Sequence, residues 1–273
     1  MDVLITVDEL AAALSATPPP VLLDVRWSLA RPRRRAEYLA GHLPGAVHVE
    51  LERDLSGDAG PRDGRHPLPA IERLQASARA WGIHDGDRVV VYDDSGNQSS
   101  ARAWWLLTAA GLRGVRMLDG GLPAWVAAGG TLEAGDVHPA AGDVTLAYGH
   151  LPTIDLDGAA AFPAHGALLD ARAGERYRSE TEPIDPRAGH IPGAVSAPTS
   201  DNLADGAFRS TAELRERFAG LIGEGAAVGV YCGSGVTASH EIAALAVAGI
   251  DAALYPGSWS AWSSDATRPV ATT

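Results

Sequence analysis

Cysteine is almost absent from this sequence, which contains one thiol, Cys232, in 273 residues. A lone cysteine can form neither an intramolecular disulfide nor a thiolate zinc cluster, so we expect a protein of the reducing cytoplasm. No apolar run approaches the length that spans a membrane. The start, MDVLITVDEL, lacks the basic and apolar stretches of a signal peptide, so no membrane association is expected.

Positive charge is also scarce, since 22 Lys and Arg stand against 34 Asp and Glu, which gives a formal net charge of -12. This balance argues against binding to nucleic acid, and the one basic run, RPRRR at 31–35, is interpreted as a solvated loop. With 3 Phe and 2 Met, the core must be built mostly from Ala, Val, Leu and Trp. The nine histidines form no HxH, HxxxH or Cys/His cluster, so neither a metal nor a cofactor is expected.

What the sequence does contain is an internal repeat. Four segments return in the same order: LLDVR (22–26) as LLDAR (168–172), GHLPGAV (41–47) as GHIPGAV (189–195), VVVYDD (89–94) as VGVYCG (228–233), and LDGGLPAW (118–125) as LYPGSWSAW (254–262). We interpret the chain as two copies of one domain, 1–135 and 150–273, joined by a linker at about 129–155.

Each copy alternates short apolar runs with helical patterns. In the second copy the runs predict strands near 167–170, 194–196, 227–231 and 252–255, and helices near 211–222, 237–248 and 258–263. Short apolar strands that alternate with helices are typical of a parallel sheet covered on both faces. The predicted fold class is therefore α/β, with a mainly parallel sheet flanked by helices in each copy.

The cysteine lies between a predicted strand, Val228–Tyr231, and a helical pattern that follows. The loop after Cys232 consists of small residues that can cradle an anion with their backbone N–H groups: Gly233, Ser234, Gly235, Val236 and Thr237. Such a cradle favours the thiolate over the thiol. The first copy has Asp93 where the second has Cys232, so we expect one catalytic copy and one supporting copy.

Two chemistries can use a cysteine in such a cradle. A phosphatase of the Cys-x5-Arg type needs a guanidinium at the sixth position after the cysteine, where this chain has Ala238. The loop contains no Arg or Lys at all, which makes a phosphatase the weaker reading. A persulfide carries a charge that N–H groups alone can hold, and it fits the loop better.

The motifs together resemble those of the tandem-domain rhodanese family, the thiosulfate and 3-mercaptopyruvate sulfurtransferases. The resemblance rests on DVRW and GHLPGAV in the first copy and on DAR, ERY, GHIPGAV and CGSGVTA in the second. It implies two rhodanese-like domains, an inactive first and a catalytic second. It also implies a ping-pong reaction in which Cys232 takes sulfur from a small-molecule donor and passes it to cyanide or a thiol acceptor.

The resemblance also implies further site residues. Arg176, in AGERYR, matches the family's substrate-binding arginine, and Arg187 is the nearest equivalent of a second one. From the first copy, ELERDLSG supplies Glu52, or Asp54 in a shifted register, and GRHPLP supplies His66. His66 can hydrogen-bond Ser234 or carry a proton to the leaving pyruvate enolate. Trp27, after DVR, is expected to wall the pocket.

The choice of donor depends on charge. Relatives of the thiosulfate type carry cationic residues after the cysteine, whereas CGSGVT is neutral and resembles the mercaptopyruvate type. Mercaptopyruvate is therefore the expected donor. A thiosulfate-preferring enzyme, and a persulfide carrier or thiol sensor without turnover, stay open as alternatives. Because two fused copies already form an inter-domain cleft, a monomer suffices.

The repeated histidines and aspartates call for another explanation. His42 and His190 occur in both copies, including the one without a cysteine, so a structural role is expected for them. The same reasoning predicts that Asp24 and Asp170 tie down neighbouring loops.

Overall fold

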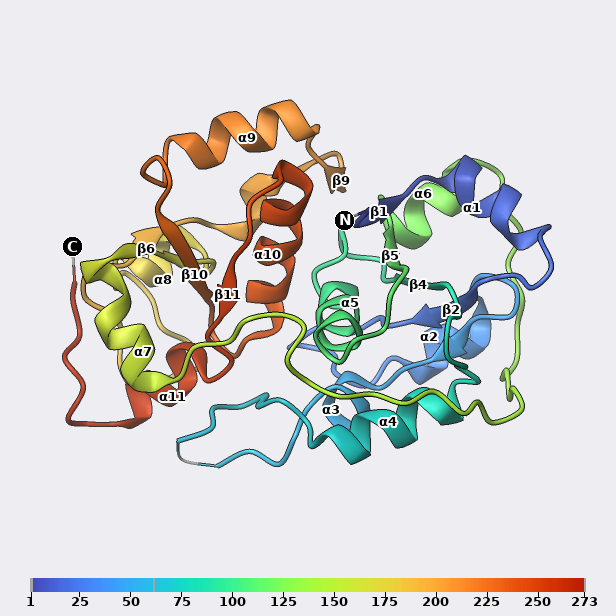
Figure 1. Ribbon diagram of the computed structural model, residues 1–273, viewed down its shortest axis with the longest axis horizontal. Helices are drawn as coiled ribbons and strands as arrows, with labels where there is room; N and C mark the ends of the chain where they lie inside the picture. The colour runs from blue at the N-terminus through green and yellow to red at the C-terminus, as the bar shows by residue number, and fades with distance from the viewer. Residues whose placement is uncertain (1, 61, 273) are drawn as a thin grey trace. The chain divides into compact units, whose positions relative to one another are not determined.

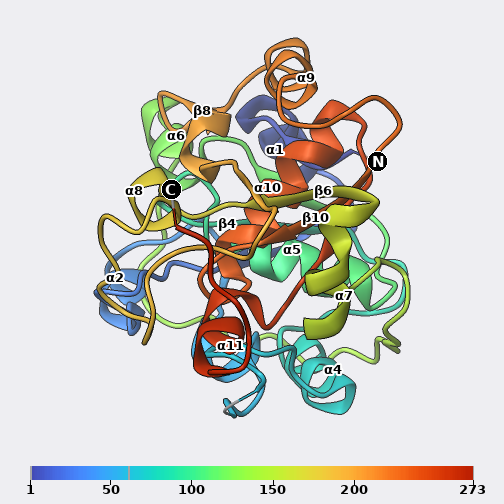
Figure 2. The same cartoon turned by 90° about the vertical axis from the view of Figure 1, so that its left-hand side faces the viewer.

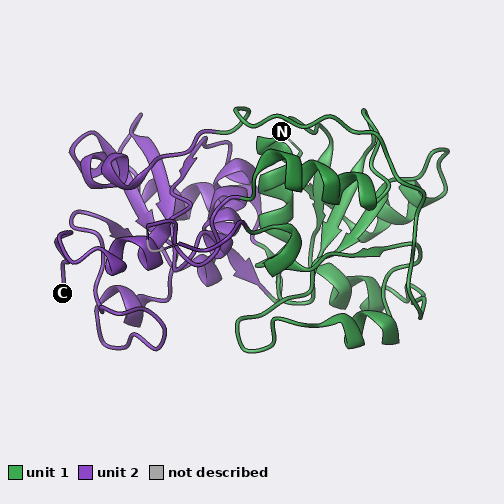
Figure 3. Cartoon of the chain, turned by 90° about the horizontal axis from the view of Figure 1, so that it is seen from below, with its two compact units in different colours: residues 1–56, 69–151, 205–208 green, residues 57–68, 152–204, 209–273 purple. Residues whose placement is uncertain are grey.

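In the computed structural model, residues 2–60 and 62–272 are described, and they form two compact units. The first comprises the chain up to residue 56 together with 69–151 and 205–208. The second comprises 57–68, 152–204 and the chain from 209 onward (Figure 3). A short segment from the first half of the sequence, 57–68, thus belongs to the second unit.

The first unit is built on a five-stranded sheet in the order β1-β5-β4-β2-β3, and every strand pair in it is parallel. The strands are β1 (Leu4–Ile5), β2 (Val21–Asp24), β3 (Val47–His48), β4 (Val89–Tyr92) and β5 (Val115–Leu118). All four residues of β4, VVVY, are buried because the strand lies in the middle of the sheet.

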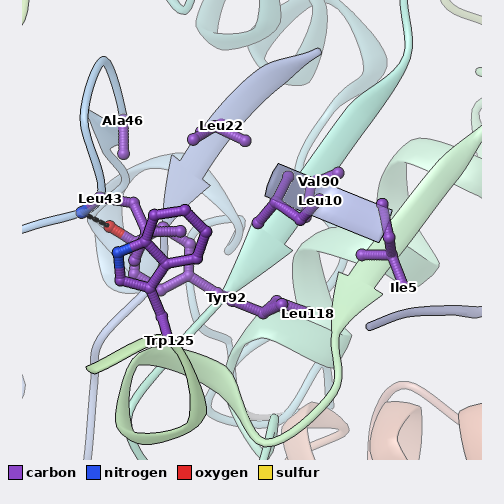
Figure 4. Packing of buried hydrophobic residues seen from close by; sticks show 9 residues of the cluster. All are labelled: Ile5, Leu10, Leu22, Leu43, Ala46, Val90, Tyr92, Leu118 and Trp125. Atoms are coloured by element: carbon purple, nitrogen blue, oxygen red, sulfur yellow. Dashed lines mark hydrogen bonds between the residues drawn. The ribbon is translucent and has the colours of Figure 1, made fainter. Parts of the chain in front are cut away.

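Helices cover this sheet (Figure 1). They are α1 (Val7–Leu14), α2 (Arg35–Ala40), α3 (Leu51–Asp54), α4 (Ile71–Ala80), α5 (Ser100–Ala109) and α6 (Gly121–Ala127). In the core drawn in Figure 4, the Tyr92 ring packs among aliphatic side chains near Trp125. Its hydroxyl accepts a hydrogen bond from the Leu43 N–H at 3.1 Å, so the one polar atom of this ring is satisfied.

The second unit is built on a four-stranded parallel sheet in the order β11-β10-β6-β7. Its strands are β6 (Gly166–Asp170), β7 (Val195–Ser196), β10 (Ala227–Tyr231) and β11 (Ala253–Leu254), and the chain also has two short strands, β8 (Leu203–Ala204) and β9 (Ala207–Phe208). The central strand β10 is buried from Val228 onward. The strand leads directly to Cys232, the residue that follows Tyr231.

The helices of the second unit include α10, which lies against β10 (Figures 1 and 2). They are α7 (Leu156–Ala161), η1 (Phe162–Ala164), α8 (Gly174–Tyr177), η2 (Thr199–Asn202), α9 (Thr211–Ala219), α10 (Val236–Ala248) and α11 (Ser258–Ser264). The core beside the sheet contains Tyr231, Trp259 and Trp262, each at most 1% exposed. As the composition predicts, most of the buried hydrophobic residues are Ala, Val, Leu and Trp.

The repeated motifs hold the same structure in both units. Asp24 binds the Arg26 guanidinium, with contacts as short as 2.7 Å, and Asp170 binds Arg172 in the same way, at 2.6 Å. In each GH(L/I)PGA motif the histidine Nδ1–H donates to a tyrosine carbonyl, and the ring stacks on that same tyrosine: His42 on Tyr38 and His190 on Tyr177. The structural roles expected for these residues are confirmed.

The predicted α/β class and parallel sheets are confirmed, and the strands and helices of the second copy lie within a few residues of their predicted positions. The connecting segment runs with the first unit as far as residue 151. Its backbone is hydrogen-bonded there, for example from the Gly142 N–H to the Arg79 carbonyl at 2.8 Å and from Ala147 N–H to the Ala110 carbonyl at 3.0 Å.

Candidate active site

Cys232 is the first residue after β10, at the edge where the parallel strands of the second unit end. Its side chain is 1% exposed, and the backbone N–H of Gly235 donates to Sγ at 3.1 Å. Gly235 has a φ of 81°, a left-handed conformation that glycine adopts without strain, and α10 begins at the next residue. The sulfur therefore lies at the N-terminus of a 13-residue helix, where partial positive charge favours an anion.

The start of α11 holds this loop in place. The Ser258 hydroxyl accepts from the Cys232 N–H at 3.2 Å, and the N–H groups of Trp259 and Ser260 donate to the carbonyls of Cys232 and Gly233, each at 2.9 Å. Ser258 is buried and has a φ of 53°, an uncommon conformation for a residue with a side chain. The backbone on both sides of the thiol is thus fixed by three hydrogen bonds.

The equivalent loop of the first unit shows what such a cradle binds. There the carboxylate of Asp93 accepts four backbone N–H groups: Ser95 and Asn97 on one oxygen, each at 2.8 Å, and Ser99 and Ser100 on the other, at 2.8 and 3.0 Å. Asp93 is fully buried. In the first unit the cradle is therefore filled by an anion that belongs to the chain itself.

His66 and Ser234 meet in the second unit. His66 belongs to segment 57–68, and its Nδ1 lies 2.7 Å from the Ser234 hydroxyl. Both side chains are buried, at 3% and 8% exposed. The hydrogen bond that the sequence suggests between His66 and Ser234 is present, and Ser234 belongs to the loop that carries Cys232. Of the other predicted cradle residues, Val236 and Thr237 form the first turn of α10.

Arg176, at the end of α8, lies against the same loop. A Cβ atom at position 233 would be 3.3 Å from its Nη1, so the guanidinium packs over the residue that follows Cys232. Its Nη2 donates to Glu182 at 2.7 Å and to Asp185 at 3.0 Å. Arg176 therefore brings a fixed positive charge to the position where the sequence places a substrate-binding arginine.

A second guanidinium at this position, that of Arg65, was missed by the sequence analysis. Its Nη2 would be 3.2 Å from a Cβ atom at position 233, and its Nη1 is paired with Asp185. The signal that could have identified it is its place in GRHPLP, directly before His66. Burial raises the pKa of the Asp185 carboxyl, against the opposing effect of Arg65.

Arg187 is placed differently from what the sequence suggests. Its guanidinium donates to four backbone carbonyls at and beyond the end of α11, those of Trp262, Ser263, Asp265 and Arg268, at 2.6 to 2.9 Å. These contacts cap the C-terminus of α11, where unpaired carbonyls and a partial negative charge favour a cation. The arginine that accompanies Arg176 over Gly233 is Arg65, not Arg187.

Trp27 and Glu52 lie together in the first unit. The indole N–H of Trp27 donates to the Glu52 carboxylate at 3.1 Å. Asp54, the alternative to Glu52, is buried and is bound by the Arg53 side chain at 2.8 Å and by the Glu50 N–H at 3.0 Å. The Asp54 carboxylate is thus occupied by bonds within the first unit, whereas Glu52 is the more exposed of the two carboxylates.

A buried polar network supports α10. Glu241 is fully buried on this helix and accepts from the Asn202 side-chain amide at 2.6 Å and from Arg217 at 3.4 Å. Burial raises the pKa of Glu241 to about 7, although Arg217 lowers it. The neighbouring His240 contacts Thr199 at 2.6 Å. Because α10 begins at the Cys232 loop, this network anchors the helix whose N-terminus faces the sulfur.

Within residues 2–60 and 62–272, no group of three or more His, Cys, Asp or Glu side chains is arranged to hold a metal ion. No helix in the same part of the chain is both long and apolar enough to cross a membrane.

Comparison with known proteins places this geometry in context. The family model of the rhodanese-like domain matches residues 6–128 and again residues 156–265. SseB of Mycobacterium tuberculosis, which has a provisional thiosulfate sulfurtransferase name, is 52% identical, over 98% of this chain and 96% of its own length. A protein of Pseudomonas aeruginosa with a provisional 3-mercaptopyruvate sulfurtransferase name is 46% identical, over 98% of each chain.

Solved structures agree with these matches. The crystal structure of SseA from Escherichia coli, reported as a 3-mercaptopyruvate sulfotransferase, superposes with a TM-score of 0.84. The alignment covers 95% of this chain and 100% of SseA, at 31% sequence identity. The two rhodanese-like domains expected from the sequence are therefore confirmed.

Proposed function

Because the chain belongs to the rhodanese-like family, we propose that it is a sulfurtransferase that carries sulfur as a persulfide on Cys232. The observation that carries the proposal is the setting of the chain's one thiol. Its sulfur accepts the Gly235 N–H at 3.1 Å at the N-terminus of α10, and the guanidiniums of Arg65 and Arg176 lie over the next residue. A terminal sulfur anion at this position is stabilised by N–H groups and positive charge.

The proposed donor is 3-mercaptopyruvate. The Cys232 thiolate attacks the donor sulfur, so that an S–S bond forms while the C–S bond breaks and its electron pair leaves with the pyruvate enolate. The proton of the donor thiol ends on the enolate carbon, which gives pyruvate and the Cys232 persulfide anion. Cyanide or a thiolate then attacks the terminal sulfur, the S–S bond breaks, and its electron pair returns to Sγ.

Two groups assist the first half-reaction in this proposal. Arg176 binds the donor carboxylate, since a guanidinium can offer it two N–H groups. The Ser234–His66 pair, at 2.7 Å, moves the proton from the donor thiol to the enolate. Glu52 and Trp27 are proposed to belong to the wall of the donor site, as the family resemblance implies.

The donor is tested by comparing kcat/KM for 3-mercaptopyruvate with kcat/KM for thiosulfate, with cyanide as the common acceptor. We expect mercaptopyruvate to be preferred by about tenfold or more. A preference for thiosulfate would contradict the donor assignment but not the persulfide. Loading of one sulfur atom on Cys232, detected by mass spectrometry, without steady-state turnover of either donor would replace the enzyme with a persulfide carrier.

Replacing Ser234 by alanine tests the proton route. We expect kcat/KM for mercaptopyruvate to fall by about 10²-fold, because the enolate loses its proton source. With thiosulfate the loss should stay within about threefold, since sulfite leaves without a proton.

The matched control is Ser239→Ala, which removes a hydroxyl that bonds to the Gly235 carbonyl at 3.1 Å on the helix side of the same loop. Any loss of kcat/KM in Ser239→Ala should be the same for mercaptopyruvate and for thiosulfate. Equal losses with the two donors in Ser234→Ala would show that Ser234 supports the loop and carries no proton.

For the organisation of the chain, we propose that 150–273 is the catalytic domain and 1–135 the supporting one. Segment 57–68 of the first half supplies Arg65 and His66 to the catalytic unit. A lone thiol that must be reduced to react suits a cytoplasmic location, and the proposal needs only one copy of the chain.

A further inference from the structure

Two arginines approach the Cys232 loop from segments far apart in the sequence. Nη2 of Arg65 and Nη1 of Arg176 would lie 3.2 and 3.3 Å from a Cβ atom at position 233. The loop itself has no charged residue between Cys232 and Thr237. The positive charge that the sequence of the loop lacks is therefore supplied by other parts of the second unit.

Asp185 lies between these two arginines. One carboxylate oxygen is paired with Nη1 of Arg65, and the other accepts from Nη2 of Arg176 at 3.0 Å. The Asp185 side chain is 2% exposed, and its backbone N–H donates to Glu182 at 3.0 Å. The Asp185 carboxylate is thus fixed in place. Because it engages Nη1 of Arg65 and Nη2 of Arg176, a donor must use other nitrogens of the two guanidiniums.

The guanidinium nitrogens nearest to Gly233, the residue after Cys232, are not the ones that the carboxylates engage. Nε and Nη2 of Arg176 are engaged by Glu182 and Asp185, while Nη1 faces Gly233. In Arg65, Nη2 faces Gly233, and Nε is buried with no hydrogen-bond partner among the described residues. A cavity of about 350 Å³ adjoins Arg65, and its lining also includes Asp185 and Ser260. Because the two guanidiniums converge on Gly233, a small carboxylate beside this residue can contact both of them.

The charges in this cluster balance before a donor binds. Arg65 and Arg176 face two carboxylates, Asp185 and Glu182. The nearby Arg172 is paired with Asp170 at 2.6 Å and with Glu182 at 3.4 Å, so three guanidiniums face three carboxylates. The leftover N–H groups can hold a donor with one negative charge, but the cluster has no excess positive charge, so a second negative charge on the donor adds to the electrostatic cost of binding.

We propose that Asp185 determines donor specificity, because it neutralises one of the two guanidiniums and thereby favours a monoanionic donor over the thiosulfate dianion. Arg65 is the second donor-binding arginine of the pair. This inference rests on the proposed function, since it concerns the donor of the same sulfur transfer. It also explains how a site with two arginines can select for a single carboxylate.

The test is Asp185→Asn, which keeps the shape of the side chain and removes its charge. We expect the ratio of kcat/KM for thiosulfate to kcat/KM for mercaptopyruvate to rise by about tenfold, chiefly through a lower KM for thiosulfate. The control is Glu180→Gln, which makes the same change of charge in an exposed pair with Arg178. The control should leave the ratio unchanged.

The reciprocal variant, Arg65→Gln, makes the cluster more negative. We expect it to lower kcat/KM for both donors and to lower that for thiosulfate more, so that the ratio moves in the opposite direction. It also covers the case in which Asp185→Asn fails to fold. Folded variants whose ratio does not move, or moves the other way, would overturn the inference.

Failure of the proposed function has a different signature. If the unaltered protein turns over neither donor, charge selection is measured by binding alone. The measurement is how far added pyruvate or sulfate slows the alkylation of Cys232 by a thiol reagent. Asp185→Asn should then increase protection by sulfate about tenfold and leave protection by pyruvate nearly unchanged. Equal changes with the two anions would contradict the role of Asp185.

Discussion

Replacing Cys232 by serine is expected to abolish sulfur transfer, with a fall in kcat of roughly 10⁴-fold or more. Cys232 is the only cysteine in the sequence, so no other thiolate can take over the attack on the donor. A serine hydroxyl is hardly ionised at neutral pH and does not form the S–S bond on which the transfer depends. The measurement is steady-state turnover with each donor, together with the mass of the protein after incubation with donor alone.

The variant protein should stay folded, because serine has nearly the same shape and can accept the Gly235 N–H in place of Sγ. The thermal unfolding midpoint should therefore change by only a few degrees. The mass of the folded variant should show no added sulfur. Turnover within about tenfold of the unaltered protein would mean that the sulfur passes through another group.

Replacing Asp93 by alanine is expected to destabilise the first unit by about 3 kcal/mol or more. The carboxylate is fully buried and accepts the N–H groups of Ser95, Asn97, Ser99 and Ser100. Without it, four donors in one loop lose their acceptor, and water can satisfy only part of them. Hydrogen exchange of these four amides should rise toward that of an open loop.

Unfolding of the two units need not be one transition, so a residue-resolved measurement is preferable to a single midpoint. The matched control is Asp8→Ala, which removes an exposed carboxylate from α1 of the same unit. That change should cost only a few tenths of a kcal/mol. Similar stability in the two variants would show that the cradle of the first unit does not need an anion.

The sequence was sufficient to predict the fold because its signals are local and occur twice. The repeated LLDVR and GHLPGAV motifs revealed two copies, and apolar runs such as 227–231 located the strands. The position of Cys232 after a strand and before a helix follows from the same patterns. A resemblance in GRHPLP, rather than a pattern, pointed to His66.

The parts of the site that the sequence did not predict depend on contacts between residues far apart in the chain. Arg65 meets Asp185 across 120 positions, and no periodicity links the two. Arg187 was misplaced because its actual partners are backbone carbonyls 75 to 81 residues later. Carbonyl acceptors leave no trace in a sequence, since every residue has one.

The hydrogen bonds from Arg187 to the end of α11 tie residues 262–268 to the segment that carries Asp185. Arg187 lies two residues after Asp185, and the His190 N–H bonds to the Ala271 carbonyl at 2.9 Å. Residues 262–271 therefore hold in place the segment 185–190, which includes Asp185. Under the role proposed for Asp185, loosening these contacts would free Asp185 and broaden the range of donors.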